Sequence, residues 1–258
     1  MENKLNFFDF AAEVGLTKQL GGLKATQELI ELCHIDQNKY ILDVGCGVGV
    51  TPCYVAKRYG CRVVGVDIYE KMIDRSNERA KREGVEDHVE FRVADAQDLP
   101  FEDDLFDAVI CESVLAMVPD KPKAMQEYVR VTKPGGFVGL NESTWIKTPP
   151  PVDLIEWVGQ DSGGIAQVLS ADGWVGLLEN AGLRDIVVRT YKVNARSELI
   201  KIIRRYGLRG YLGASRRMLS LYRKSPAYRT FLKEVKETGA MPKHASEYFG
   251  YGIYVGRK

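Results

Sequence analysis

The segment that most constrains the fold is ILDVGCGVGVTPCYVAKRYGCRVVGVDIYEKMI, from Ile41 to Ile73. It contains an apolar run, a cluster of glycines, a stretch of helical periodicity that Gly60 ends, and a second apolar run that ends at Asp67. This order predicts a strand, a tight loop, a helix and a second strand. Because parallel strands need a crossover connection, the segment predicts a parallel sheet with helices against its faces.

The same alternation of strand and helix patterns continues along the chain, and several of the strands are almost wholly apolar, as expected when both faces of a sheet are buried. We therefore expect an α/β fold in a single domain over residues 1–258. Further strands are predicted at 89–95, 106–113, 137–143 and 184–193. The expected parts are an N-terminal helical cap at 1–38, a core with the glycine loop at 39–193, a helical lid insertion at 194–245 and a final strand at 246–258.

Composition sets limits on location and redox state. No apolar run approaches the roughly 20 residues that span a bilayer, and the N-terminus lacks the order of a signal peptide, so we expect a cytoplasmic protein. The cysteines number five and form no CxxC pattern, which favours buried, reduced thiols over disulfides or a zinc site. The histidines are scattered, and we expect no bound metal.

The glycine loop limits the kind of ligand that the sheet holds. Gly45, Gly47 and Gly49 form G-x-G-x-G, whereas the dinucleotide fingerprint G-x-G-x-x-G needs a glycine where Val50 stands. The phosphate-binding G-x-x-x-x-G-K-[ST] pattern is also missing. Asp43 precedes the loop, where a carboxylate repels a pyrophosphate and suits a ligand with a cationic group. These features weigh against a nicotinamide oxidoreductase.

Two more acids follow the next strands. Asp67 ends the second predicted strand, where a carboxylate can accept both hydroxyls of a ribose. Asp95 ends the third, where its carboxylate can accept from an adenine amino group. A single acid at such a position is readily explained as a helix N-cap or turn residue. Three acids at consecutive strand ends around a glycine loop favour a nucleoside site.

The motifs ILDVGCGVG, VVGVD, ADAQDLPF, FDAVICESVLAMV and VTKPGGFVGL together carry a family resemblance. In order and spacing they resemble class I S-adenosylmethionine-dependent methyltransferases over residues 39–140, and the chain looks most like the ubiquinone, menaquinone and sterol branch, which acts on small molecules. The resemblance implies a Rossmann-like, seven-stranded, mostly parallel sheet whose last strand is antiparallel, plus the helical lid. It also implies S-adenosyl-L-methionine as cofactor, a sulfonium nucleoside without phosphate.

The resemblance assigns residues to the methionine end of this cofactor. Gly45, Cys46 and Gly47 would line that end, and Asp43 would lie near its amino group. Glu112, at the end of the fourth predicted strand, would lie below the methyl donor. The pair Gly21 and Gly22 resembles an N-terminal stretch that closes over the cofactor in small-molecule members, although a helix-breaking turn explains two glycines equally well.

The resemblance also assigns residues to the nucleoside end. Asp67 would accept from the ribose hydroxyls, and Ile68 would pack on the adenine. Met72 matches the family's apolar residue at the adenine edge, with a core position on a helix as the equal alternative. Asp95 and the Ala96 amide would read the adenine amino edge.

Methyl transfer from a sulfonium is an in-line displacement, so alignment and exclusion of water matter more than a strong base. Glu112 and Glu142, both at predicted carboxyl ends of strands, are the candidates for orienting or deprotonating an acceptor. A small organic acceptor is expected. Methylation of DNA bases is disfavoured, because CESV stands where base-specific members have [DN]-P-P-[FY].

The segment from Arg196 to Lys236 concentrates positive charge. It has twelve Lys and Arg against two Glu, a local charge of +10 in a chain whose net charge is +1. The favoured interpretation is a helical lid over the acceptor pocket with its charges in water. Docking on an anionic membrane, an acidic substrate and, last, RNA are the alternatives. The rival functions are an RNA or protein methyltransferase and a non-catalytic S-adenosylmethionine-binding protein.

Overall fold

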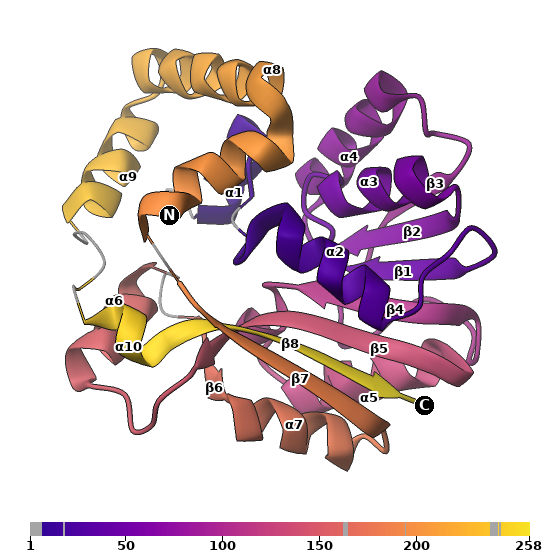
Figure 1. The fold of residues 1–258 in the computed structure, drawn as a ribbon. Coiled ribbons are helices and arrows are strands. Elements are labelled where there is room, and N and C mark those ends of the chain that lie inside the picture. The colour runs from indigo at the N-terminus through magenta and orange to yellow at the C-terminus, as the bar shows by residue number, and fades with distance from the viewer. Residues whose placement is uncertain (1–6, 18, 162–164, 194, 238–241, 243) are drawn as a thin grey trace.

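The fold is built around one sheet (Figure 1). The computed structural model describes residues 7–17, 19–161, 165–193, 195–237, 242 and 244–258. The strands follow the order β3-β2-β1-β4-β5-β8-β7, and a short β6 pairs with β5. Their bounds are β1 Tyr40–Val44, β2 Arg62–Asp67, β3 Val89–Val93, β4 Phe106–Glu112, β5 Thr132–Trp145, β6 Leu169–Ser170, β7 Arg184–Lys192 and β8 Phe249–Arg257.

The strand directions confirm the predicted sheet. β8 runs antiparallel to β5 and to β7, while β1, β2, β3, β4 and β5 pair in parallel. The two-residue β6 is an eighth strand that the sequence does not predict. β5 also begins earlier than expected, at Thr132, because its pairing with β4 jumps from Phe106↔Thr132 to Ala108↔Phe137. Residues 133–136 of β5 form an irregularity in this pairing. They include Gly135, whose φ of 78° is left-handed.

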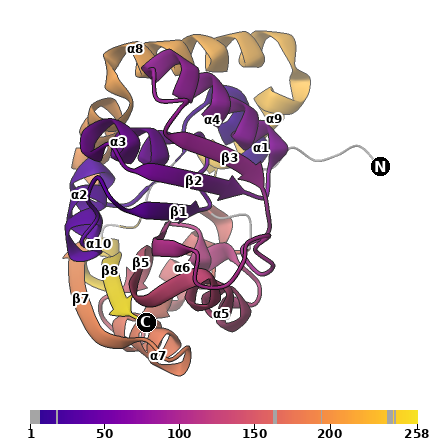
Figure 2. The same cartoon turned by 90° about the vertical axis from the view of Figure 1, so that its right-hand side faces the viewer.

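Helices cover both faces of the sheet, as parallel strands require. Side chains alternate along each strand, so Ile41 packs with α2 and α3 residues while Leu42 packs with α5 and α7 residues. Figure 2 shows α2 and α3 on one side of the strands and α5 on the other. The helices are α1 Phe7–Val14, α2 Gly22–Leu32, α3 Val50–Tyr59, α4 Glu70–Glu83, α5 Lys121–Val131, α6 Val152–Asp161, α7 Ala171–Asn180, α8 Ala195–Lys224, α9 Pro226–Glu237 and α10 Ala245–Tyr248, with a 3₁₀ turn η1 Leu115–Met117.

Helices α8 and α9 come between β7 and β8 in the sequence. In Figure 1 they lie with α1 at the upper left, the end towards which the parallel strands point. α8 is bent at Gly207, whose φ of 68° and ψ of 162° are not helical. The bend divides α8 into two helical parts, and α9 follows as a separate helix. Parts of the predicted cap and lid, residues 1–6, 18, 194, 238–241 and 243, lie outside the described residues.

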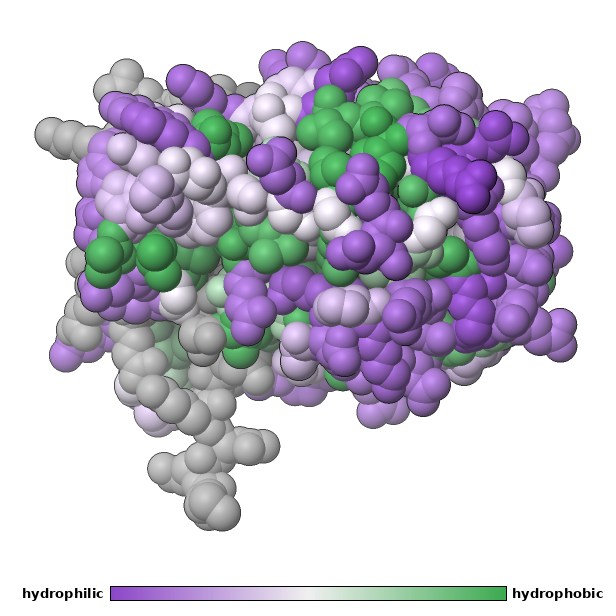
Figure 3. Space-filling view, turned by 90° about the horizontal axis from the view of Figure 1, so that it is seen from below, coloured by the Kyte–Doolittle hydropathy of each residue, from purple (hydrophilic) through white to green (hydrophobic). Residues whose placement is uncertain are grey.

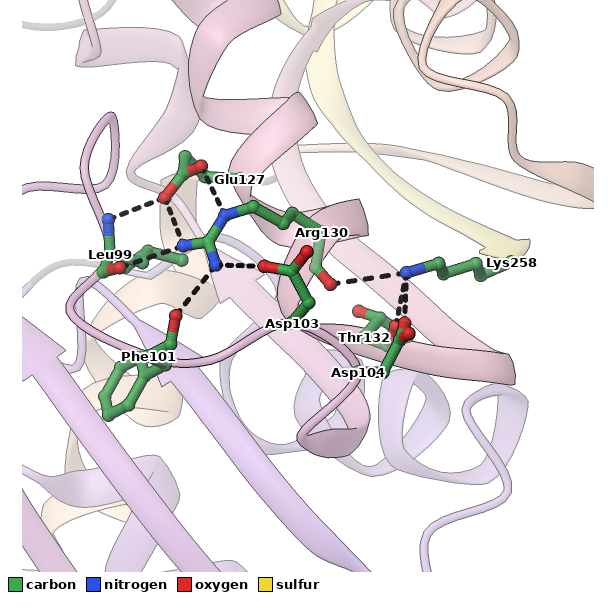
Figure 4. A network of polar contacts seen from close by, with 8 residues as sticks. All are labelled: Leu99, Phe101, Asp103, Asp104, Glu127, Arg130, Thr132 and Lys258. Carbon is green, nitrogen blue, oxygen red and sulfur yellow. Dashed lines mark hydrogen bonds and ion pairs between the residues drawn. The ribbon is translucent and has the colours of Figure 1, made fainter.

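The opposite end of the sheet is tied by a polar network (Figure 4). Arg130 donates to the carbonyls of Leu99 and Phe101 at 2.9 and 2.8 Å and pairs with Glu127 and Asp103, both at 2.7 Å. Lys258, beyond the end of β8, lies 2.6 Å from Asp104 and donates to the carbonyls of Arg130 and Thr132. These contacts hold the loop before β4 and the C-terminal end of β8 against α5.

All five cysteines are buried, as predicted. None of the described helices has an apolar stretch of the length needed to cross a membrane. The lower face of the molecule, around α7 in Figure 1, carries hydrophobic residues in separate patches between polar ones (Figure 3).

Candidate functional site

A pocket opens at the carboxyl ends of β1, β2 and β4, beneath α1 and α8. This is the edge of a parallel sheet at which ligands bind in open α/β folds. Most of the residues that the sequence predicts for a ligand site line this pocket. They are Asp43, Gly45, Cys46, Gly47, Asp67, Ile68, Met72, Asp95, Ala96 and Glu112.

The glycine loop turns tightly because its glycines adopt left-handed backbone angles. Gly45 has φ 76° and Gly47 has φ 54°. The amides of Gly45 and Cys46 both donate to the carbonyl of Val66, at 2.8 and 2.9 Å, which fixes the loop against β2. A Cβ at Gly45 would overlap the side chain of Val114. The loop therefore presents bare backbone to the pocket.

Asp67 combines a structural contact with a place in the pocket wall. Its Oδ2 accepts from the Gly47 amide at 2.9 Å and its Oδ1 from the Tyr69 amide at 3.0 Å. Burial raises the pKa of Asp67, and these amides oppose the rise. Each carboxylate oxygen can accept more than one hydrogen bond, so Asp67 can also receive hydroxyl donors from a ligand. Ile68, beside it, leaves 59% of its surface exposed.

Two other predicted contacts have local structures that clarify their roles. Met72 is 2% exposed and packs with Ala11 and Tyr206, so it is at once a core residue and part of the pocket wall. β3 ends at Val93, and Asp95 therefore lies in the turn after the strand rather than at its end. Its Oδ1 accepts from the Gln97 amide at 2.9 Å.

Asp43 is the least compensated acid of the site. It is 2% exposed, and no hydrogen bond reaches its carboxylate from the part of the chain that the structure describes. Burial raises the pKa of Asp43 well above its ordinary value, and the neighbouring Glu112 raises it further, while Arg205 opposes the rise. A buried carboxylate without a partner is costly, and a cationic ligand group relieves that cost.

Glu112, by contrast, is surrounded by donors. Its carboxylate accepts from Thr51 Oγ1 at 2.8 Å, Thr26 Oγ1 at 3.0 Å and Asn141 Nδ2 at 3.4 Å, and it makes a short contact with Gln19 Nε2. These donors come from the N-terminal segment, α2, α3 and β5. Glu112 therefore joins four parts of the chain at the base of the pocket.

Comparison with known proteins agrees with this geometry. The model of a family described as a methyltransferase domain matches residues 42–140. An uncharacterized protein of Haemophilus influenzae is 34% identical over 69% of this chain and 72% of its own length. Methyltransferase GfsG of Streptomyces halstedii is 32% identical over 63% of this chain and 59% of its own length. The chain belongs to the class I S-adenosylmethionine-dependent methyltransferases.

Among solved structures, phosphoethanolamine N-methyltransferase 2 of Haemonchus contortus, in complex with S-adenosyl-L-methionine, superposes on this methyltransferase with a TM-score of 0.72. The two are 19% identical, so the match concerns the fold. It covers 100% of this chain and 58% of the Haemonchus chain. This chain thus spans less than two thirds of that enzyme and of GfsG.

The pocket suits the family's cofactor, S-adenosylmethionine. When bound, the cofactor supplies an electrophilic methyl group on a sulfonium. In this methyltransferase, Asp43, whose carboxylate accepts no hydrogen bond from the described residues, would hold the ammonium group, and Asp67 would accept from the ribose hydroxyls. The exposed Ile68 provides an apolar surface for a base.

Glu142 does not face this pocket, contrary to the sequence-based prediction. It is 0% exposed, and its carboxylate accepts from the amides of Val114, Leu115 and Ala116 at 2.9, 2.7 and 3.4 Å. Side chains alternate along β5, so Asn141 points to the Glu112 side of the sheet and Glu142 to the other. Glu142 therefore holds the turn after β4, of which Val114 lines the pocket.

Gly21 and Gly22 also lie outside the pocket wall. Gly21 caps the N-terminus of α2 with φ 78°, and a Cβ there would overlap Tyr251 and Ala25, so these glycines form the helix-starting turn. The residues of this stretch that reach the pocket are Thr17 and Gln19, which the sequence does not single out.

Arg205 is another pocket residue that the sequence does not single out. It comes from α8, lines the pocket and donates to Thr51 Oγ1 at 3.2 Å and Thr26 Oγ1 at 3.4 Å. The sequence shows only one of many arginines in a basic helix. No local pattern distinguishes the one that points inward.

Proposed function

We propose that this methyltransferase transfers the methyl group of S-adenosylmethionine to a small organic acceptor with an apolar part. The observation that carries the proposal is the pocket wall beyond the residues predicted for the cofactor. There the wall includes the apolar residues Phe8, Ala11, Met117, Pro119 and Ile165, together with polar residues such as Gln97, Ser113 and Arg205. Such a wall suits a small molecule better than an RNA backbone or a charged peptide.

The name of one similar protein supports the same substrate class. The Haemonchus contortus structure that resembles this chain belongs to a phosphoethanolamine N-methyltransferase. We extend to this chain only the general class of small acceptors. The narrower resemblance to the ubiquinone, menaquinone and sterol branch stays a prediction.

The residues of this chain contribute mainly alignment and the exclusion of water. α1 and α8 cover the pocket and contact each other. Tyr206 of α8 accepts from the Thr17 amide at 2.7 Å and donates to the Thr17 carbonyl at 3.1 Å, which joins α8 to the segment after α1. Displacement on a sulfonium needs no strong base. Because the oxygens of Glu112 and Glu142 are engaged by protein donors, we assign both carboxylates positioning roles.

The first test is calorimetric titration with S-adenosylhomocysteine and, separately, with NADH. We expect micromolar binding of the first alone. Formation of S-adenosylhomocysteine from S-adenosylmethionine is then followed with quinols, sterols, lipids and small amines as acceptors, and in parallel arms with total RNA and with protein. Turnover with a small molecule alone supports the proposal. Methylation of RNA or protein alone contradicts it, and binding without turnover in any arm favours a non-catalytic cofactor-binding protein.

We also propose that α8 docks on an anionic membrane, which would bring a lipid-dissolved acceptor to the pocket. Leu208, Leu212, Leu219 and Tyr222 are 48% to 64% exposed. Their spacings of four, seven and three residues return to one face of the helix. An apolar stripe of this kind, left in water on a helix, is typical of helices that lie in a membrane interface.

The charge of the same region favours an anionic surface. From 203 to 233 the sequence has nine Lys and Arg and no Asp or Glu. Arg216, Arg223 and Lys224 are exposed next to the apolar stripe. Basic side chains beside exposed leucines match a bilayer with acidic headgroups, because the basic groups can pair with the headgroups while the leucines enter the apolar interface.

Co-sedimentation with vesicles tests this docking. We expect binding to vesicles of phosphatidylglycerol and phosphatidylcholine, and little binding to pure phosphatidylcholine. A Leu212→Ser/Leu219→Ser variant should lose binding. The control variant Val152→Ser/Ile155→Ser removes apolar residues of α6 that are at least as exposed, and it should retain binding. Equal binding of both variants to the vesicles contradicts the proposal. The proposal is also contradicted if RNA displaces the wild type from the vesicles and the leucine variant still binds RNA.

A further inference from the structure

Arg205 brings a positive charge from α8 to the same end of the pocket as Asp43. We infer that Arg205 binds the α-carboxylate of the cofactor's amino-acid moiety, opposite Asp43, which takes the ammonium group. This inference rests on the proposed use of S-adenosylmethionine. It makes a helix inserted before the last strand a part of the cofactor site.

The position of Arg205 places its guanidinium near the glycine loop. Its Thr51 contact, at 3.2 Å, lies in the first turn of α3, two residues after Gly49 ends the loop. Asp43 precedes the loop at the end of β1, and Arg205 is near enough to lower its pKa. One anion and one cation thus flank the loop. An α-amino acid is a zwitterion, so the pair matches both of its charges.

The guanidinium has donors to spare. Its Nε is buried without a hydrogen-bond partner, and Arg205 forms no salt bridge within the described residues. Its two hydrogen bonds, at 3.2 and 3.4 Å, go to neutral hydroxyls. A guanidinium in a partly enclosed site is expected to pair with a carboxylate through two parallel hydrogen bonds.

The acid nearest to these hydroxyls is not that partner. Thr51 and Thr26 both direct their hydroxyl groups to Glu112, at 2.8 and 3.0 Å. Each hydroxyl has one proton and two lone pairs, so it can donate to Glu112 and accept from Arg205 at once. The two threonines therefore separate Glu112 from Arg205 and orient the guanidinium, and its remaining donors can take a carboxylate from the pocket.

This arrangement links cofactor binding to the helix that covers the pocket. Arg205 stands two residues before the bend at Gly207. The next residue, Tyr206, is fixed through its hydroxyl to Thr17. A carboxylate bound by Arg205 would hold this part of α8 to the sheet. We therefore expect S-adenosylhomocysteine to slow amide hydrogen exchange in α8 more than a ligand without the carboxylate does.

Calorimetry with two ligands tests the inference. The ligands are S-adenosylhomocysteine and its decarboxylated analogue S-adenosyl-3-thiopropylamine, which keeps the amine and lacks only the carboxylate. We expect the wild type to prefer S-adenosylhomocysteine by about 10- to 100-fold, the usual effect of a charge-assisted hydrogen bond. In Arg205→Ala the preference should fall to near unity, and in Arg205→Lys it should be intermediate, because lysine keeps the charge without the planar fork.

Arg204→Ala is the matched control, because Arg204 is the adjacent, exposed arginine of the same helix. It should keep the wild-type preference. The ratio of two affinities within one protein does not depend on the fraction that is folded. An Arg205→Ala variant with the wild-type preference overturns the inference, as does a wild type with no preference. Failure of the wild type to bind either ligand refutes the proposed cofactor as well.

Discussion

The Gly47 amide lies 2.9 Å from Oδ2 of Asp67, which joins the glycine loop directly to the acid at the end of the next strand. The other oxygen of the same carboxylate accepts from the Tyr69 amide at 3.0 Å. Asp67 thus shapes the loop, and we propose that it also accepts from the ribose of the cofactor. The loss of its carboxylate should affect both the fold and the cofactor.

Substitution of Asp67 should separate these two effects. Asp67→Asn keeps an acceptor oxygen for one amide, whereas Asp67→Ala leaves both amides without it. We expect both variants to bind S-adenosylhomocysteine more weakly, by about 10-fold or more, since a hydrogen bond to a charged group is lost. Only Asp67→Ala should also unfold at a clearly lower temperature. Calorimetry and thermal unfolding followed by circular dichroism measure the two quantities, and unchanged affinity in both variants would contradict the assigned role.

Two glycines with the same backbone angle provide a matched pair for the loop. Gly45 has φ 76° and Gly60 has φ 73°. A Cβ at Gly45 would overlap Val114, whereas a Cβ at Gly60 meets nothing within 4 Å. We expect Gly60→Ala to lower the free energy of unfolding by about 1 kcal/mol, the cost of a left-handed alanine. Gly45→Ala should cost more and should weaken cofactor binding, because Val114 must move within the pocket wall.

Denaturant unfolding and calorimetry on both variants check this pair. Equal loss of stability, with cofactor affinity unchanged in Gly45→Ala, would show that the backbone angle alone matters there.

The network around Arg130 should stabilise the fold far from the pocket. Its guanidinium joins Glu127, Asp103 and the carbonyls of Leu99 and Phe101 (Figure 4). We expect Arg130→Ala to lower the free energy of unfolding by about 2 kcal/mol, because several charge-assisted hydrogen bonds are lost together. Under conditions in which the variant is fully folded, its affinity for the cofactor should not change.

Arg92→Ala serves as the control for Arg130→Ala. Arg92 pairs with Glu90 at 2.5 Å, but both side chains are about half exposed, and such surface pairs contribute little. We expect its effect on the free energy of unfolding to stay below about 0.5 kcal/mol. Similar effects of the two substitutions in urea unfolding would mean that the Arg130 network is also only a surface pair.

The sequence predicts the sheet and the loop well because both depend on local patterns. The apolar strands, the glycines from Gly45 onwards and the spacing to Asp67 are visible in one short segment. Glu142 is predicted wrongly as a pocket residue, because a position in a strand does not say which face it occupies when both faces are buried. Arg205 is missed because its contacts with Thr26 and Thr51 join residues 179 and 154 positions apart.

The buried carboxylate of Glu142 should make stability depend on pH. Burial raises the pKa of Glu142 to about 7, although three amides favour its charged form. Between the pKa of an exposed glutamate, about 4.3, and this value the folded chain binds more protons than the unfolded chain. Stability from this group is therefore present at acidic pH and is lost as pH rises, by a free energy on the order of 3 kcal/mol between pH 4.5 and pH 8.

Urea unfolding of the wild type and of Glu142→Gln at pH 5, 6, 7 and 8 measures this loss. The advantage of the wild type over the variant should shrink steadily from pH 5 to pH 8. Glu127→Gln is the control, because the hydrogen bond from Arg130 lowers the pKa of Glu127, so its contribution to stability is lost only as pH falls below the tested range. If the difference for Glu142→Gln is as flat over this range as that for Glu127→Gln, the Glu142 carboxylate is ionised throughout, and the three amides outweigh its burial.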